Sequence, residues 1–288
     1  MFIVKAHHQV CKIQKIIKEV KKMRGLKCLA HKGIIGGEVR PLYFYKAFGL
    51  EATGARIISF GACNFSCPYC KREGNFRSPD GSIISAVEST IEELYLVVDD
   101  AVMKQQVIRL SGGDPVVFPE ASLAIAKRVK ERGGRLSVAH NGSSPRFLKK
   151  LLETGVLESA AIDLKAPRHE FGLRAGLKNG TGAKMYERSI ETQDLLSASG
   201  ALVDVRTPIF STTTVDDLLD MAGDIVRGGR GDNEFWTIRL YKPVVGCDWE
   251  PPRSLDYVTW MISQVKKEFP SLKIGLRARW EPNGFLYF

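Results

Sequence analysis

The sequence predicts an α/β fold built on a mainly parallel sheet. From Arg56 onward, short β-rich runs alternate with helix-length segments, several of those segments end in glycine, and polar residues recur where the apolar runs end. Strands that alternate with helices of about 10 to 15 residues are typical of βαβ units. Right-handed crossovers would place the helices outside the sheet and bring the carboxyl ends of the strands to one rim.

Strands and helices are expected in strict alternation. The expected strands cover residues 55–61, 107–112, 136–142, 159–167, 201–210, 235–243 and 272–278. The expected helices cover residues 85–102, 119–134, 145–155, 186–200, 214–229 and 255–269. Two segments fall outside this rhythm. Residues 1–55 form an N-terminal extension, and residues 168–185 form a Gly- and Lys-rich connection whose length is typical of functional or mobile loops.

The composition is that of an ordinary globular protein. The 288 residues are 44% apolar and 26% charged, which excludes a disordered or fibrous chain. No apolar run approaches the roughly 20 residues that span a bilayer. The N-terminus lacks the apolar region and cleavage site of a secretory signal. We therefore expect a cytoplasmic protein with no membrane association.

The N-terminal extension carries much of the net charge of +10. In residues 12–27, apolar side chains recur at three- and four-residue steps, which predicts a basic amphipathic helix. The simplest interpretation is a surface helix with solvated lysines. Alternatively, its basic face docks an acidic protein, nucleic acid or a membrane surface. No nucleic-acid-binding motif and no interleaved aromatic residues support nucleic acid as a partner.

The cysteine cluster is the most informative motif. Cys63, Cys67 and Cys70 lie within eight positions, directly after the first expected strand. Three cysteines on one loop suit a cubane iron–sulfur cluster with one iron left open, because a fourth would complete the coordination. The alternative is a structural zinc site, for which His31 or His140 would supply the fourth ligand. The other cysteines are scattered and are interpreted as small buried residues: Cys11, Cys28 and Cys247.

The later strands also end in glycine or polar residues. Each of these residues alone is compatible with turn chemistry or with an ordinary strand-end ion pair. Together, at the carboxyl ends of neighbouring parallel strands, they predict a binding site at one rim, whether the sheet closes into a barrel or stays open. In chain order they are Gly112, Gly113, Asp114, His140, Asn141, Asp163, Lys165 and Arg206.

The motif Cys63-x3-Cys67-x-Tyr69-Cys70 after a first strand resembles the signature of the radical S-adenosylmethionine enzymes. The resemblance implies a partial (β/α)6-type barrel over residues 56–288. It also implies two cofactors, S-adenosylmethionine and one [4Fe-4S] cluster held by three cysteines. In that superfamily, one electron from the cluster cleaves S-adenosylmethionine to a 5′-deoxyadenosyl radical, which abstracts hydrogen from a substrate. An electron donor such as ferredoxin or flavodoxin is therefore an implied partner.

The same resemblance implies roles for the first two loops of the rim. The stretch 111–115 is similar to the GGEP element of the superfamily, with Asp114 in place of the glutamate. Gly112 and Gly113 would let the backbone approach the methionine part of the cofactor. Tyr69 would lie against the adenine.

Roles for the later loops follow from the resemblance in the same way. Lys165 would meet the carboxylate of S-adenosylmethionine, and Asp163 would order its ribose side or a nearby cation. Arg206 would face the same carboxylate or the substrate, and Asn141 would shape the third loop. A buried lysine or arginine beside a carboxylate makes a charge-assisted hydrogen bond. No catalytic residue is assigned.

Within the superfamily, the chain resembles the activating enzymes of glycyl-radical enzymes, such as those of pyruvate formate-lyase and anaerobic ribonucleotide reductase. The likeness extends from residue 56 to about 245 and implies hydrogen abstraction from a glycine of a partner protein. The alternative is radical modification of a peptide, an RNA base or a small metabolite. An electron-transfer module without enzymatic activity would leave the rim motifs unexplained. The likeness rests on residues 140–142 (HNG), 162–167 (IDLKAP), 189–210 and 235–243.

Overall fold

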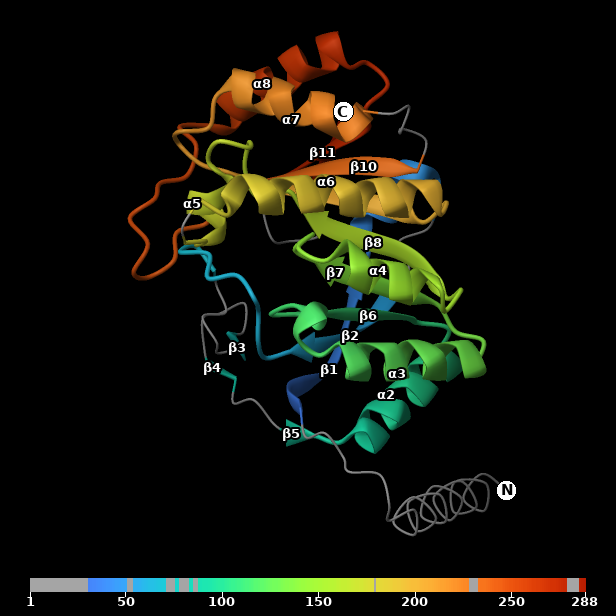
Figure 1. Ribbon diagram of the computed structural model, residues 1–288. Helices are drawn as coiled ribbons and strands as arrows, with labels where there is room; N and C mark the ends of the chain where they lie inside the picture. Colours follow the sequence, from blue (N-terminus) through green and yellow to red (C-terminus); the bar gives the residue numbers. More distant parts are fainter. Residues whose placement is uncertain are drawn as a thin grey trace, which may run out of the picture.

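The computed structural model contains one ten-stranded sheet with helices along one side (Figure 1). It describes residues 31–50, 54–70, 76–77, 83–84, 88–178, 180–227, 233–278 and 285–288. The strand order is β12-β11-β10-β9-β8-β7-β6-β2-β1-β5. A separate hairpin pairs β3 (Phe76–Arg77) with β4 (Ile83–Ile84). The predicted basic helix at 12–27 lies outside the described residues.

The central strands run parallel in chain order, which confirms the predicted fold class. The sheet is not closed, because β12 and β5 stand at its two ends. The parallel strands are β2 (Gly54–Phe60), β6 (Val107–Gly112), β7 (Leu136–His140), β8 (Leu157–Asp163), β9 (Leu202–Ile209), β10 (Glu234–Leu240) and β11 (Ile274–Arg277).

Both ends of the sheet are antiparallel, which the sequence analysis did not anticipate. Strand β1 (His31–Pro41) pairs with β2, and β5 (Glu88–Ser89) pairs with β1. At the other end, β12 (Phe285–Tyr287) pairs with β11. Residues 31–41 of the predicted N-terminal extension therefore belong to the main sheet.

The helices occupy the connections between the parallel strands. They are α2 (Ile91–Met103), α3 (Pro119–Glu131), α4 (Pro145–Leu152), α5 (Phe171–Ala175), α6 (Gly182–Ala198), α7 (Val215–Val226) and α8 (Leu255–Glu268).

The largest differences from the predicted helices lie at the start of α2 and in the connection before α6. Helix α2 begins at Ile91 because Thr90 caps it: the Thr90 hydroxyl accepts from Glu93 N, and the Glu93 carboxylate accepts from Thr90 N. The connection 168–185 is partly helical, since it contains α5 and the start of α6. Phe171 and Ala175 are fully buried, and this apolar anchor holds α5 in place.

The strands give the sheet two chemically different faces, because successive side chains point to opposite sides. The outer face is apolar and packs against the helices; its buried residues include Ile108, Leu110, Val138, Ile162, Val205, Trp236 and Ile238. The inner face is polar toward the carboxyl ends of the strands. Its buried residues include Arg109, Ser137, Ser159, Asp204 and Thr237.

A 3-10 helix, η1 (Tyr43–Phe48), covers the amino-terminal end of the inner face. The Tyr45 hydroxyl lies 3.0 Å from Ser159 Oγ and donates to Glu158 Oε1 at 2.7 Å. A second apolar cluster closes this end: Leu42, Phe44, Tyr45, Ala55, Val107 and Phe235. Polar side chains of the inner face therefore lie in the middle of the sheet and at its carboxyl rim.

Candidate active site

The predicted cysteine motif lies on the loop after β2, at the carboxyl rim of the sheet. Cys63, Cys67 and Cys70 are free thiols, and Cys70 N donates to Cys67 O at 2.9 Å. Burial, and then the charge of Asp114, raises the pKa of Cys63 to about 11. Burial also raises the pKa of Cys67, against the opposing effect of Lys165. Metal binding to these thiols therefore releases protons.

The structure bears on one of the two residues that the zinc alternative needs as a fourth ligand. The proposed fourth ligand His140 is already engaged, with Nδ1 2.8 Å from Asp114 Oδ1 and Nε2 accepting from Ser144 N at 3.3 Å. The side chain of His31 lies outside the described residues.

Two glycines bring the end of β6 against the start of the cysteine loop. Gly113 N donates to Phe60 O at 2.6 Å, and a Cβ on Gly113 would lie 2.0 Å from Ala62 O. Gly112 adopts φ +110°, and a Cβ there would lie 2.2 Å from Phe60 N. Any side chain at either position would displace the loop. The two glycines thus serve a contact between backbones, in addition to the cofactor role expected from their motif.

Another glycine, missed by the sequence analysis, holds the loop from the opposite side. Gly176 follows α5 at φ +64°, and a Cβ there would lie 2.0 Å from Ser66 O. Beside it, Ser66 N donates to Ala175 O at 3.2 Å. Its position within the 168–185 connection was the available signal, since long connections are often functional.

Asp114 joins the second loop to the third. Its buried carboxylate accepts from Val116 N at 3.0 Å and from Asn141 N at 2.7 Å. It also accepts from His140 Nδ1, which carries the proton because Nε2 accepts from Ser144. These donors occupy both carboxylate oxygens, so the side chain of Asp114 positions loops.

Asn141 connects the third loop to the cysteine motif. Its Nδ2 donates to Asn64 Oδ1 at 2.7 Å and lies 3.6 Å from Cys63 Sγ. Its Oδ1 accepts from Ser143 N at 3.0 Å. Asn141 therefore links the backbone of its own loop to Asn64 and offers a donor to the first thiol. Hydrogen bonds to ligand sulfurs help to set cluster potentials.

Asp163 and Lys165 form an ion pair, with Nζ 3.0 Å from Oδ2, which is the strand-end pairing that the sequence left open as the alternative to a cofactor contact. Lys165 is 8% exposed and lies 5.9 Å from the centroid of the Phe65 ring. Burial tends to lower the pKa of Lys165, but Asp163, Tyr69 and Cys67 raise it well above its ordinary value. A buried ammonium is thus held beside the cysteine loop.

Tyr69 lies in an aromatic cluster that sequence reasoning did not find. Its ring centroid is 5.3 Å from that of Phe210 and 5.8 Å from that of Trp249. The Tyr69 hydroxyl is buried and has no hydrogen-bond partner among the described residues, and burial raises its pKa. An unpaired buried polar atom beside three free thiols fits a site built for a bound group.

Arg206 lies on the inner face, where it pairs with Asp163 across the β8–β9 ladder. Its Nε donates to Asp204 Oδ2 at 2.5 Å. Burial tends to raise the pKa of Asp163, but Lys165, Arg239 and Arg206 lower it below its ordinary value. Arg206 therefore contributes positive charge to the predicted rim site.

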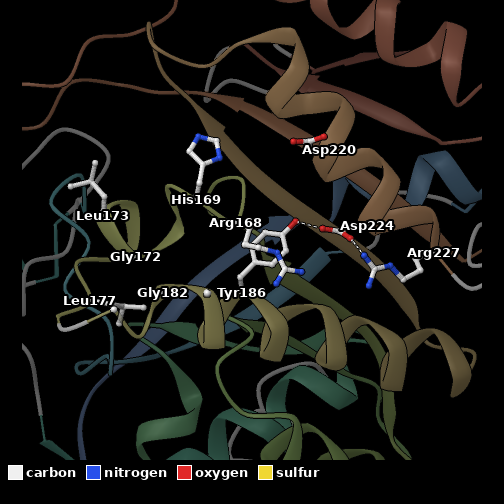
Figure 2. Close-up of a pocket in the computed structure, with 12 residues that line it drawn as sticks. Arg168, His169, Gly172, Leu173, Leu177, Gly182, Tyr186, Asp220, Asp224 and Arg227 are labelled. Carbon is white, nitrogen blue, oxygen red and sulfur yellow. Dashed lines mark hydrogen bonds and ion pairs between the residues drawn. The ribbon is translucent and has the colours of Figure 1, made fainter.

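A cavity of about 870 Å³ lies on the helix side of the sheet, among α5, α6 and α7 (Figure 2). Several of its charged groups already have partners. Tyr186 donates to Asp224 at 2.6 Å, Asp224 also pairs with Arg227, and Arg168 pairs with Glu187. None of the predicted site residues lines this cavity, so the rim is the stronger candidate.

Comparison with known proteins identifies the family of the chain. The model of the Radical SAM superfamily matches residues 57–225, more than half of the chain. The chain belongs to the radical SAM superfamily. Radical SAM proteins are enzymes that bind a [4Fe-4S] cluster through three cysteines and use S-adenosylmethionine. The free thiols and the unpaired Tyr69 hydroxyl fit these cofactors.

Two curated relatives differ in the activity that their names give. "Putative glycyl-radical enzyme activating enzyme MJ1227" from Methanocaldococcus jannaschii is 23% identical over 195 residues, which are 67% of this chain and 75% of the relative. "Probable GTP 3',8-cyclase" from Thermococcus kodakarensis is 32% identical over 127 residues, 44% of this chain and 39% of the relative. The family is therefore shared, while the activities of the relatives diverge.

A solved structure shows the same fold. Streptococcus suis SuiB bound to precursor peptide SuiA superposes with a TM-score of 0.58 at 9% identity. The match covers 78% of this chain and 48% of SuiB, so the chain spans about half the length of that protein. At this identity the likeness shows the fold alone. Among the described residues, no helix is both long and apolar enough to cross a membrane.

Proposed function

We propose that this radical SAM enzyme cleaves S-adenosylmethionine reductively at the cysteine loop and abstracts hydrogen from a substrate on the polar inner face. The observation that carries the proposal is the placement of Lys165, which is buried beside Cys67 and paired with Asp163 on the inner face. One ammonium thus connects the cysteine loop with the inner face. When bound, the cluster supplies the single electron for the cleavage.

The residues of the chain would bind and orient the cofactor. Lys165 would hold its carboxylate, because a carboxylate shielded from water needs a cationic partner. The aromatic surface at Tyr69 would pack against the adenine, and the Tyr69 hydroxyl would find a polar partner there. Backbone groups at Gly112 and Gly113 would face the methionine part. Asp163 would order the ribose side or a nearby cation.

The geometry favours a small polar substrate, which is the alternative from the sequence analysis. Buried charged groups line the inner face, including Arg109 and Asp204. A backbone glycine of a partner protein offers no charge to these groups. The relative from T. kodakarensis, whose name gives GTP as its substrate, supports the same class.

Activation of a glycyl-radical enzyme is a second candidate. It is favoured by the relative MJ1227, whose aligned part covers three quarters of its own length. A peptide substrate has a parallel in SuiB, whose structure contains a precursor peptide. In either case the enzyme needs a reductant, and we propose ferredoxin or flavodoxin as the electron donor.

The proposal is tested by anaerobic incubation of cluster-loaded protein with S-adenosylmethionine and dithionite. We expect 5′-deoxyadenosine and methionine in equal amounts, with formation lost in Cys67→Ala and retained in Cys247→Ala. Absence of both products from cluster-loaded wild-type protein would refute the proposal. Substrate class is tested by deuterium transfer into 5′-deoxyadenosine: from a labelled small molecule for the first candidate, or from protein labelled at glycine Cα for the second.

A further inference from the structure

We propose that the inner face contains a subsite for an anionic oxygen group of the substrate, a phosphate or a carboxylate, with Arg109 as its central ligand. Arg109 lies in the middle of β6 and is 4% exposed. Its Nη1 donates to Ser137 Oγ at 3.0 Å. Its Nη2 is buried and has no hydrogen-bond partner among the described residues. The assignment of this anion to the substrate rests on the proposed function.

Among the residues that the structure describes, no carboxylate forms a hydrogen bond or an ion pair with Arg109. Asp204 is buried nearby, but its oxygens accept from Arg206 Nε at 2.5 Å and from the Thr237 hydroxyl. Asp163, which acts on the neighbouring arginines, is paired with Lys165. Arg109 is thus left with a neutral serine as its hydrogen-bond acceptor.

Positive charge accumulates around this guanidinium. Burial and the charges of Arg206 and Arg239 lower the pKa of Arg109 to about 9, against the opposing effects of Asp204 and Tyr45. Burial and the charges of Arg206 and Arg277 likewise lower the pKa of Arg239 to about 10, against the opposing effects of Asp163 and Asp204. Buried cations that lower one another's pKa are destabilising unless an anion joins them.

The nearby polar groups do not supply that anion. Ser137 accepts from Arg109 and also from Ser159, whose Oγ lies 2.8 Å away. Ser159 in turn contacts the Tyr45 hydroxyl. These hydroxyls satisfy one another and bring no negative charge. An uncharged side chain at position 109 would avoid the cost of burying a guanidinium, so we attribute its presence to a bound anion.

A second cavity shares one arginine with this group of cations. A cavity of about 300 Å³ lies at the carboxyl ends of β10 and β11, and its lining includes Arg239, Lys242 and Arg277. No acidic residue among the described residues lines it. Arg239 belongs both to this lining and to the groups that act on Arg109. The cavity and the arginine group on the inner face therefore share Arg239.

The subsite lies further from the carboxyl rim of the sheet than the predicted cofactor contacts do. Ser159, in register with Ser137, precedes Asp163 by four residues on β8, which corresponds to about 13 Å along the strand. An anionic group at Arg109 would anchor one end of the substrate. The reacting carbon would then lie nearer the rim, where Lys165 and the cysteine loop are found.

Anion binding tests this inference without turnover. Calorimetric titrations use the anaerobic, cluster-loaded full chain with pyrophosphate or malonate, at ionic strength matched with sodium chloride, with and without saturating S-adenosylmethionine. We expect at least one anion to bind in the presence of S-adenosylmethionine. The tighter of the two identifies the group as phosphate or carboxylate.

Variants assign the binding to Arg109. Arg109→Gln should weaken binding at least tenfold, while thermal stability without anion stays unchanged or rises. Arg109→Lys keeps the charge but loses the planar guanidinium, so it should also bind the anion more weakly. This variant provides the test if the Gln variant does not fold. Arg132→Gln, which removes an arginine on the opposite side of the sheet that pairs with Asp99, should bind like the wild type.

Three results would overturn the inference: neither anion binding wild-type protein, both Arg109 variants binding like the wild type, or S-adenosylmethionine abolishing anion binding. The last result would assign the arginines to the carboxylate of the cofactor. The proposed function fails separately. Wild-type protein that binds an anion but forms no 5′-deoxyadenosine would refute that function and leave the anion site standing.

Discussion

On strand β6, Ile108 and Leu110 point into the apolar core, whereas Arg109 between them faces the polar inner side of the sheet. Strand β10 repeats the pattern, with Trp236 and Ile238 on the outer face and Thr237 between them on the inner face. Both sets of residues are buried, yet their energetic roles are opposite. Outer residues gain free energy by leaving water, while inner charges lose hydration and need partners.

Stability and function therefore reside on opposite faces of the sheet. The outer face holds the helices to the sheet and contributes the stability of the fold. The inner face contains charges whose partners are incomplete within the protein, as Arg109 Nη2 shows. Substitutions on adjacent residues of one strand should therefore have separable effects on unfolding and on binding.

The largest expected effect is on the outer face. Leu110→Ala should lower the free energy of unfolding by about 2 to 5 kcal/mol, because it leaves a cavity in a fully buried core. Ser111→Ala, one residue further along on the inner face, should change it by less than about 1 kcal/mol. Urea denaturation measures both. Equal losses would contradict the division between the faces.

The next largest effect is expected where Gly176 contacts the cysteine loop. Gly176→Ala should cost about 2 to 4 kcal/mol of unfolding free energy and reduce iron content, because the new Cβ would collide with Ser66 O. Gly180→Ala is the matched control. It has a similar φ of +68° and nothing within 4 Å of the added Cβ. A Gly176→Ala variant with the cost and iron content of the control would show that the contact is unimportant.

A smaller effect is expected from Lys165→Ala. The variant should retain its cluster but bind S-adenosylmethionine at least tenfold more weakly, since the carboxylate loses its buried ammonium. Equilibrium binding to cluster-loaded protein measures this. Lys149→Ala, on the exposed side of α4, is the control and should bind normally. An unchanged affinity in Lys165→Ala would remove this residue from the cofactor site.

The smallest expected effect is the pH dependence from Asp163. Its pKa is lowered in the folded protein, so the stability that it contributes is present above its unfolded value of about 3.8 and is lost as pH falls through the folded pKa. Wild-type protein should therefore lose its stability advantage over Asp163→Asn as pH falls below about 4. Denaturation from pH 7 to pH 3 measures this. A constant difference would show that the Asp163–Lys165 pair does not stabilise the fold.

Local patterns were enough to predict the parallel strands and the cysteine loop. The β-rich composition of residues 107–112 predicts a strand. The spacing of Cys63, Cys67 and Cys70 predicts the metal chemistry of the cysteine loop without knowledge of the fold. The antiparallel edge β1 could not be predicted, because its pairing with β2 depends on tertiary packing.

Contacts between distant loops were also beyond the sequence. Asp114 looked like a cofactor contact, but its carboxylate is occupied by His140 and Asn141 from the next loop. Gly176 contacts Ser66 across a large separation in sequence. The sequence pattern around Arg109 was informative, because a charged residue between Ile108 and Leu110 in a strand must point to the face opposite the apolar one. The lack of a hydrogen-bond partner for Arg109 Nη2 among the described residues could be recognised only from the assembled sheet.

The metal content of the protein distinguishes an iron–sulfur cluster from a zinc site. Anaerobically reconstituted wild-type protein should contain about four irons and four sulfides per chain. Cys63→Ala, Cys67→Ala and Cys70→Ala should each lose them, whereas Cys247→Ala should keep them. Stoichiometric zinc without iron in wild-type protein purified without oxygen would contradict the account.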